Sequence, residues 1–247
     1  MNIRSAYLGL VGILSIASVA SAATIEAIAD SSIREGSGSA YVVTTNLPLA
    51  YSLASKGSYK AYLKFDVSSV DLDDPNNAEV ILKVASLEQR NLAAGAALRL
   101  YGLHEGATAG GTNPTEADWS DDPLGKYIVW TIEGHLAPGN NPTAADKLNG
   151  MDLTQATLLG AFSLGTGPLT AGQVITLSGQ ALSQFVRSDT NGVVTLVLTV
   201  EGANGQNVNL AAREHAEFLA PTLEFVPEPA TLGLVAVGLA VVTRRRR

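Results

Sequence analysis

Apolar and polar residues alternate along much of the chain with the two-residue period of β-strands. In YKAYLKFDV every second residue from Ala61 to Val67 is apolar, while Lys60, Tyr62 and Lys64 share the opposite face. Other strand-like runs are EVILKVASL, AALRLYGL, YIVWTI, LLGAFSL, QVITL, VVTLVLTV, VNLAAR and PTLEFV. Alternate positions of these runs predict a core that includes Leu63, Phe65, Val80, Leu82, Leu196, Leu198 and Leu223.

One segment has helical spacing instead. GQALSQFVRSD places Leu182, Phe185 and Val186 on one side of a short helix, and Ser178 is a candidate for its N-cap. Many short strands, turn-rich segments such as DLDDPNN and APGNNPTAAD between them, and one brief helix predict an all-β domain. The expected fold is a jelly-roll β-sandwich.

The first 22 residues have the three parts of a secretory signal peptide. Arg4 gives a basic start, an apolar run extends from Tyr7 to Ile16, and Ala20-Ser21-Ala22 ends the segment with small residues. An N-terminal membrane helix is the alternative, but the small-residue close and the polar chain that follows favour cleavage before Ala23. We therefore expect export through the Sec translocon and processing by signal peptidase.

The chain ends in VPEPATLGLVAVGLAVVTRRRR. Its apolar run from Ala230 to Val242 would form roughly 20 Å of helix, which is short for a bilayer core of about 30 Å. The prolines on either side of Glu228 cannot lie inside that helix. Basic residues stay on the cytoplasmic side, so Arg244, Arg245, Arg246 and Arg247 would anchor that end. This layout predicts transient membrane insertion with a cleavage point just outside the membrane.

These 22 residues resemble the PEP-CTERM sorting segment of bacterial surface proteins. The resemblance includes Val226, Pro227, Glu228 and Pro229 as the motif, then the short hydrophobic helix and the arginine cluster. It implies an exosortase as partner, a membrane-embedded protease-transpeptidase that cuts near the motif and releases or re-attaches the protein outside the cell. A permanent tail anchor is the alternative, and the signal peptide and the short span both disfavour it.

Residues 23–225 then form one domain, because this length suits a single core. The full chain has 16 basic and 23 acidic residues, and removing Arg4, the terminal arginines and Glu228 leaves 11 against 22, a net charge of −11. Such an acidic domain repels phosphate backbones, which excludes nucleic acid as a partner. The chain has no cysteine, which excludes disulfides, thiol chemistry and cysteine-ligated zinc.

A second resemblance extends over most of this domain. The order of YLKFD at Tyr62–Asp66, a late Arg213-Glu214 strand and a final Pro221-x-Leu223 strand is similar to the DNRLRE or disaggregatase-related modules. Ala212 replaces the serine usual in that family, and the long asparagine-rich loop is absent. The resemblance implies a β-sandwich of the carbohydrate-binding-module type and extracellular polysaccharide as partner.

Catalytic motifs are absent from the sequence. No HExxH, GxSxG or glycine-rich phosphate loop is present. His104-Glu105, Glu133 with His135, and Glu214-His215 put imidazoles near carboxylates in sequence, but neighbours along a strand point to opposite faces. We therefore expect a protein that is not an enzyme and needs no cofactor.

Two acidic loops have the hard oxygen ligands that calcium prefers. One contains Asp71, Asp73, Asp74 and Asn77; the other contains Asp118, Asp121 and Asp122. The first lacks the glycine and closing glutamate of an EF-hand, so only an irregular site is possible there. Structural calcium is thus a minor alternative to solvated acidic loops, and no metal site is predicted.

Sugar binding requires aromatic side chains that present a face to solvent. Trp119, flanked by Asp118 and Ser120 in a loop, is the strongest candidate, whereas Trp130 lies in a strand-like run and is expected in the core. Tyr62 shares its strand face with Lys60 and Lys64, a patch able to attract acidic sugars. Arg213 and Glu214 are expected to form a structural ion pair inside the fold.

Together these features predict an exported protein, first held in the inner membrane and then released or attached at the cell surface or in the extracellular matrix. Its non-catalytic sandwich would bind or scaffold extracellular polysaccharide. Two alternatives stay open: a polysaccharide-degrading, lyase-like enzyme on the same fold, and a purely structural coat protein.

Overall fold

The structure is a computed structural model of the 247-residue chain. It describes residues 22–34, 40–41, 45–52, 58–87, 96–108, 114–121, 128, 151–165, 168–201 and 205–227. The predicted signal peptide, the C-terminal helix and the strand around Trp130 lie outside these residues. In the part of the chain described, no helix is long and apolar enough to cross a membrane.

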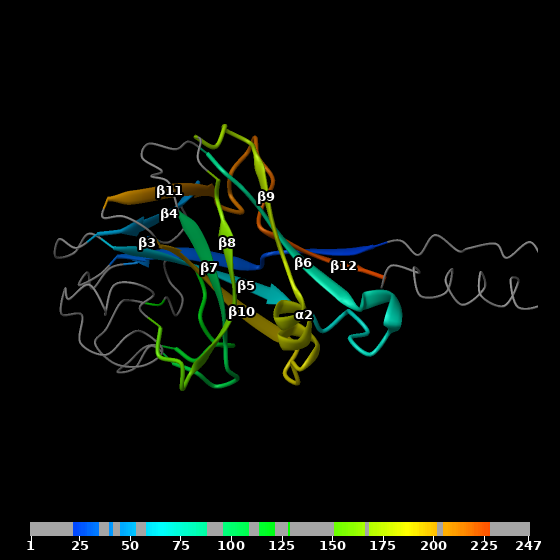
Figure 1. Cartoon of the computed structure of the whole chain (residues 1–247). Coiled ribbons are helices and arrows are strands. Elements are labelled where there is room, and N and C mark those ends of the chain that lie inside the picture. The colour runs from blue at the N-terminus through cyan, green and yellow to red at the C-terminus, as the bar shows by residue number, and fades with distance from the viewer. Residues whose placement is uncertain are drawn as a thin grey trace, which may run out of the picture.

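The smaller of two sheets has four antiparallel strands. Its order is β1 (Ala23–Glu26), β12 (Thr222–Val226), β6 (Glu79–Ala85) and β9 (Val174–Ser178). β1 pairs with β12 so that Ala23 lies opposite Phe225. The two ends of the domain therefore emerge side by side at one end of this sheet (Figure 1).

The larger sheet has eight antiparallel strands. Its main path is β11 (Gln206–Ala211), β4 (Asn46–Tyr51), β5 (Tyr59–Asp66), β10 (Val193–Glu201), β7 (Ala97–Leu103) and β8 (Ala156–Ser163). β2 (Ala29–Arg34) pairs with β5 and with the short β3 (Ala40–Tyr41). The sequence pattern did not predict β1 to β4, because β2 is rich in polar residues and β4 contains Pro48.

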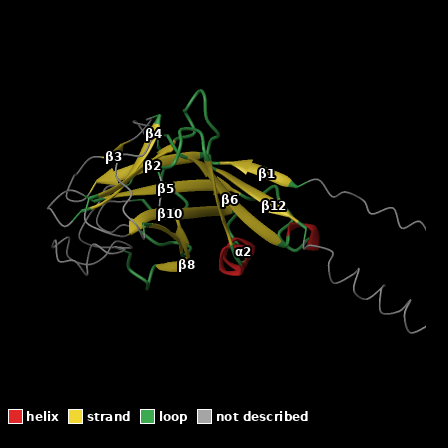
Figure 2. Cartoon of the chain, turned by 45° about the horizontal axis from the view of Figure 1, so that its top comes forward, coloured by secondary structure: helices red, strands yellow, loops and turns green. Residues whose placement is uncertain are grey.

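The chain crosses repeatedly between the two sheets, which face each other across one core (Figures 1 and 2). Helix α2 (Gln180–Arg187) lies between β9 and β10 in sequence, and a short 3-10 turn, η1 (Pro75–Asn77), precedes β6. The predicted β-sandwich with one short helix is confirmed. The helix lies within the predicted segment, but Gly179 is its N-cap instead of Ser178, and no side-chain hydrogen bond caps it.

The core between the sheets contains all seven residues predicted from the strand period. Leu63, Phe65, Val80, Leu82, Leu196, Leu198 and Leu223 are fully buried there. Helix α2 adds Leu182 and Val186 to the same core. Its Ser183 hydroxyl accepts a hydrogen bond of 2.9 Å from the Val80 amide, which attaches the helix to β6.

A second core covers the outer face of the larger sheet. Residues of the β7–β8 connection lie over the alternate, outward positions of β5, β7 and β10, namely Tyr62, Tyr101 and Val197. The covering residues include Ala107, Trp119, Ile128 and Met151. Both faces of β5 are therefore covered, whereas its alternating pattern predicts one face in solvent.

Candidate functional site

The predicted sugar-binding aromatic residues are buried in the second core. Trp119 is only 1% exposed, and its ring meets the edge of Tyr62 at a centroid distance of 6.3 Å. Its indole Nε1 donates a hydrogen bond of 2.9 Å to Thr195 Oγ1 on β10. The prediction that Trp119 and Tyr62 present exposed faces is wrong, because the loop that carries Trp119 folds back over the strand that carries Tyr62.

The two lysines of β5 hold this covering loop in place. Lys64, 8% exposed, donates from Nζ to the carbonyl oxygens of Ala117 and Trp119, the latter at 2.8 Å. Burial lowers the pKa of its ammonium group. Lys60 is also buried, with Nζ 3.9 Å from Met151 Sδ. The predicted patch for acidic sugars is therefore also wrong: these ammonium groups face protein rather than solvent.

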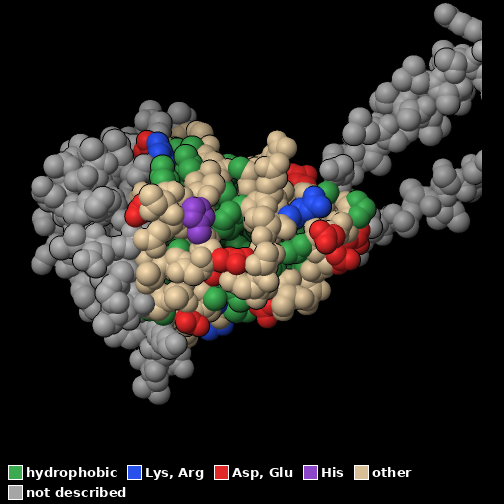
Figure 3. All heavy atoms as spheres, turned by 90° about the horizontal axis from the view of Figure 1, so that it is seen from below, with side chains coloured by type: hydrophobic (Ala, Val, Ile, Leu, Met, Phe, Trp, Pro, Cys, Tyr) green, Lys and Arg blue, Asp and Glu red, His purple; other side chains and the backbone are tan. Residues whose placement is uncertain are grey.

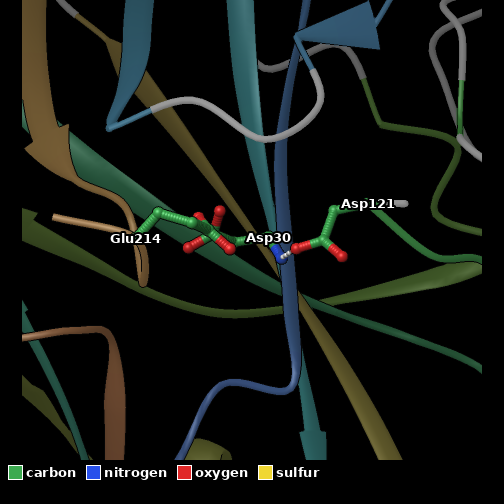
Figure 4. Close-up of side chains that lie close together, drawn as sticks. All are labelled: Asp30, Asp121 and Glu214. Atoms are coloured by element: carbon green, nitrogen blue, oxygen red, sulfur yellow. Dashed lines mark hydrogen bonds between the residues drawn. The ribbon is translucent and has the colours of Figure 1, made fainter. Parts of the chain in front are cut away.

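Arg213, whose side chain is 38% exposed, is the centre of an ion network with three largely buried carboxylates. Its Nε lies 3.0 Å from Asp121 Oδ2 and 2.7 Å from Glu214 Oε1, and its backbone amide donates to Asp30 Oδ2 at 2.6 Å. Figure 4 shows Asp30, Asp121 and Glu214 converging from three separate segments. The expected ion pair between Arg213 and Glu214 is present, but the Arg213 side chain lies at the surface rather than inside the fold.

The three carboxylates of this network each place an oxygen within 4.8 Å of the others. Burial, with the charges of Glu214 and Asp121 adding to it, raises the pKa of Asp30 to about 7, although the Arg213 amide opposes the shift. Because Arg213 contacts all three carboxylates, through its guanidinium to Asp121 and Glu214 and through its backbone amide to Asp30, we interpret the network as structural. It joins the end of the covering loop to β2 and to the segment after β11.

The two loops considered for calcium do not gather their carboxylates. Asp71 uses Oδ1 to accept the Asp73 amide at 3.1 Å, and its carbonyl oxygen accepts the Asn77 side chain at 2.8 Å. In the other loop Asp121 points to Arg213 while Asp118 is exposed, and Asp122 lies outside the described residues. Local hydrogen bonds thus account for the geometry of the first loop, and the ion network accounts for Asp121.

A surface hollow of about 300 Å³ lies where β7, β8 and β10 meet the C-terminal end of α2. We call it the acidic hollow. Its lining residues are Leu103, His104, Glu105, Glu116, Thr157, Phe185, Ser188, Asp189, Val193 and Val194. Three of these are carboxylates, and none of the described lining residues is Lys or Arg. Figure 3 shows the face seen from below, where acidic and apolar side chains lie side by side.

The turn after α2 satisfies two of the three carboxylates. Glu105 Oε1 accepts hydrogen bonds of 2.7 Å from both the amide and the hydroxyl of Thr190, which lower the pKa of Glu105. Asp189 Oδ2 accepts the Gly192 amide at 2.6 Å. These bonds fix the turn against the end of β7 and form one wall of the hollow.

Glu116 is the third carboxylate and is only partly satisfied. The residue is 2% exposed; Oε2 lies 3.5 Å from Asn191 Nδ2, and Oε1 has no hydrogen-bond partner among the described residues. Burial raises the pKa of Glu116 to about 7; Asp189 adds to the shift, whereas Asn191, Lys64 and Thr195 oppose it. Its backbone amide donates to the Ala107 carbonyl, and its carbonyl oxygen accepts the Thr195 hydroxyl.

Phe185 supplies the aromatic surface of the hollow. Its ring lies directly on Gly102 of β7, where an added Cβ atom would overlap the ring and force it to shift. His104 also lines the hollow and uses both ring nitrogens: Nε2 lies 2.8 Å from Thr157 Oγ1 and Nδ1 lies 3.2 Å from the Thr154 carbonyl oxygen. The lining therefore combines polar and apolar groups.

Neither described histidine contacts the carboxylate next to it in sequence. Glu105 bonds to Thr190, Glu214 pairs with Arg213, and His215 Nδ1 accepts the amides of Glu217 and Phe218 at 3.2 Å. His135 and Glu133 lie outside the described residues. The adjacency in sequence thus produces no His–Glu pair in the described part of the chain.

Sequence reasoning did not find the acidic hollow. The sequence pattern places Phe185 on the apolar side of the helix, and Glu105 stands out only as the neighbour of His104. Glu116 stands in the loop segment TEADW, and nothing in that segment distinguishes its carboxylate from the acidic residues nearby. The helix pattern gives a weak indication of the hollow. Phe185 lies in the last turn of the helix, close to the polar residues Arg187, Ser188 and Asp189, where an aromatic ring can reach the surface.

The sorting motif begins where the sandwich ends. Val226 is the last residue of β12 and is half-buried, as is Pro227. Glu228, Pro229 and Arg244 to Arg247 lie outside the described residues. The motif therefore directly follows a strand that is paired on both sides, by β1 and by β6.

Comparison with known protein families matches residues 225–247 to the PEP-CTERM protein-sorting motif. No curated protein matches the chain. The match agrees with the sorting segment predicted at residues 226–247, whereas no family match supports the resemblance of the sandwich to DNRLRE modules. The C-terminal motif is that of an exported, exosortase-sorted surface protein.

Proposed function

We propose that the sandwich is a non-catalytic binding module of the cell surface or extracellular matrix, with extracellular polysaccharide as its ligand and the acidic hollow as its site. The observation that carries this proposal is the composition of the hollow. It combines the aromatic ring of Phe185 with hydroxyl and carboxylate groups of Thr157, Ser188 and Glu105. Sugar rings bind through apolar contact with an aromatic face and hydrogen bonds from their hydroxyl groups.

A polysaccharide-degrading enzyme is the second candidate, because the buried Glu116 has a carboxyl pKa near neutrality, as a general acid or base would need. Cleavage of a glycosidic bond generally requires two carboxylates that are free to approach it. Here Glu105 and Asp189 already accept hydrogen bonds from the turn after α2. This arrangement favours binding over catalysis.

The binding proposal predicts that the mature protein, recovered from the surface of the producing cell, is retained on its immobilised exopolysaccharide. Phe185→Ala should lower retention about tenfold, because the apolar contact beneath the sugar ring is lost. Phe218→Ala is the matched control: Phe218 stacks on His215 and does not line the hollow. Equal retention of both variants would contradict the site, and release of reducing ends or unsaturated sugars would establish the enzyme instead.

Processing at both ends is a separate prediction. We expect the surface fraction to contain protein that begins at Ala23 and ends near Glu228, because a helix of roughly 20 Å is too short for a stable anchor. Mass spectrometry of protein recovered from cells measures both ends. A mature surface protein that still contains the peptide from Leu234 to Val242 would show that the tail is kept.

A further inference from the structure

The sorting motif and the sandwich share two residues. The family match begins at Phe225, whereas β12 ends at Val226. Phe225 is fully buried in the core between the sheets, and Val226 is half-buried. The first part of the sorting signal is therefore built into the folded domain.

Neighbouring strands hold both residues. Phe225 lies between Ala23 of β1 and Val80 of β6, and Val226 lies opposite Glu79 of β6. At Phe225 the strand is thus paired on both sides, and pairing of this kind uses the main-chain N–H and C=O groups of the strand. The end of β12 is consequently part of the smaller sheet and not an exposed tail.

A processing enzyme needs this part of the backbone as well. Peptides that bind in extended form are held through their main-chain N–H and C=O groups, and folded proteins are cut where the chain opens locally. Val226 precedes Pro227, and the residue before a proline favours an extended backbone. Val226 therefore has the extended shape that such binding requires, but its pairing with β6 occupies it.

We propose that the end of β12 controls the rate of sorting: the exosortase acts on the motif only after Phe225 and Val226 have left the sheet. Among the described strands Val226 is paired with β6 alone, whereas release of Phe225 withdraws a fully buried ring from the core. Sorting therefore follows the fraction of molecules whose strand end is open. This inference goes beyond polysaccharide binding and does not depend on it.

An engineered disulfide tests this control, because the chain has no cysteine of its own. Residues directly opposite each other in an antiparallel pair have the spacing of a disulfide, and Glu79 and Val226 are such a pair of half-buried residues. In cells that carry the exosortase, the oxidised full-length Glu79→Cys/Val226→Cys protein should be processed about tenfold more slowly than its own form reduced with dithiothreitol. Immunoblots of the membrane and surface fractions measure the conversion.

Ile81→Cys/Glu224→Cys is the matched control. It links the same two strands two residues further into the sheet, at half-buried positions outside the sorting match, and should leave the rate of processing unchanged. A second variant restores a free motif: insertion of Gly-Ser-Gly-Ser-Phe-Val after Val226 places a new Phe-Val pair before Pro227 and outside the sheet. This insertion should return the oxidised 79–226 variant to the rate of its reduced form.

Three results would overturn the inference. Equal processing of the oxidised and reduced 79–226 variant would show that the motif acts while the strand end stays paired. Equal slowing by the two disulfides would show an effect of linking the sheet in general. Slow processing that persists after the insertion would show that the position of Phe225 and Val226 in the sheet is not what limits the reaction.

Discussion

Replacement of Trp119 by alanine is expected to destabilise the domain by about 3–5 kcal/mol, the usual cost of removing a large aromatic side chain from a core. The indole packs against Tyr62, donates to Thr195 and lies beneath the Lys64 ammonium group, 5.9 Å from the ring centroid. Its loss would detach the covering loop from the larger sheet. Because folded domains are stable by about 5–15 kcal/mol, a large share of the protein would unfold on mild heating.

Urea denaturation of the mature protein, followed by circular dichroism, measures this loss. Trp119→Phe is the informative partner variant, since it keeps most of the packing and removes the hydrogen bond to Thr195; we expect it to cost about 1–2 kcal/mol. The result also separates a structural from a binding role. A Trp119→Ala protein as stable as the wild type, but no longer retained on polysaccharide, would place the side chain at a binding surface.

The strand period predicted the inner core correctly and the outer face wrongly, for one physical reason. Alternation identifies which side chains of β5 point the same way, but not what lies over them. The pattern places Lys60, Tyr62 and Lys64 on a solvent-facing row, yet residues more than 50 positions later fold over them and accept hydrogen bonds from the two lysines. A loop that buries Lys64 on its own carbonyl oxygens and Lys60 against a methionine sulfur leaves no periodic pattern in the sequence.

Polar residues also concealed strand β2. Asp30, Ser31 and Ser32 are buried side chains that an alternating pattern would assign to a turn. Their burial depends on partners far along the chain: the Ser32 hydroxyl donates to the Pro48 carbonyl at 2.6 Å, and Asp30 accepts the Arg213 amide. Sequence periodicity measures hydrophobicity, so a strand whose polar groups are satisfied by tertiary contacts is missed.

The ends of the chain were easier to interpret than its site. A sorting tail is a local property, in which the motif, the apolar run and the arginines follow one another within 22 residues. The acidic hollow takes residues from β7, β8, β10, α2 and the covering loop, and only the fold brings them together. The Arg213 network could be predicted only in part. The neighbouring Arg213 and Glu214 indicate an ion pair, but nothing in the sequence indicates that Asp30 and Asp121 also contact Arg213.

Replacement of Arg213 by methionine is expected to cost about 3 kcal/mol at pH 8, toward the lower end of the range for breaking a buried ion pair because the Arg213 side chain is 38% exposed. The variant removes the cation that Asp121 and Glu214 both contact, while the three carboxylates stay together. Glu214 Oε2 is already buried without a hydrogen-bond partner among the described residues, so no nearby group takes over.

The loss should depend on pH, and its direction follows from Asp30. The pKa of Asp30 is about 7 in the folded protein, above the value of 3.8 for an isolated side chain, so the folded state holds this proton more tightly. The stability contributed by the protonated form is full below about pH 4 and is lost as pH rises toward 7. Arg213 opposes this shift, so its removal should raise the pKa of Asp30 further and steepen the loss of stability between pH 5 and 8.

Urea midpoints of wild type and Arg213→Met at pH 5 and pH 8 test this expectation, with the larger difference at pH 8. Arg187→Met is the matched control, because Arg187 is exposed and donates from Nε to the Leu72 carbonyl rather than to a carboxylate; it should cost less than about 1 kcal/mol at either pH. Adding Asp30→Asn to Arg213→Met should restore part of the stability at pH 8, because it removes one of the repelling negative charges. The side-chain oxygen of the new asparagine can still accept the hydrogen bond from the backbone amide at position 213. Equal losses at the two pH values, or no rescue by Asp30→Asn, would show that Arg213 stabilises the fold through packing of its side chain and not through the charges around it.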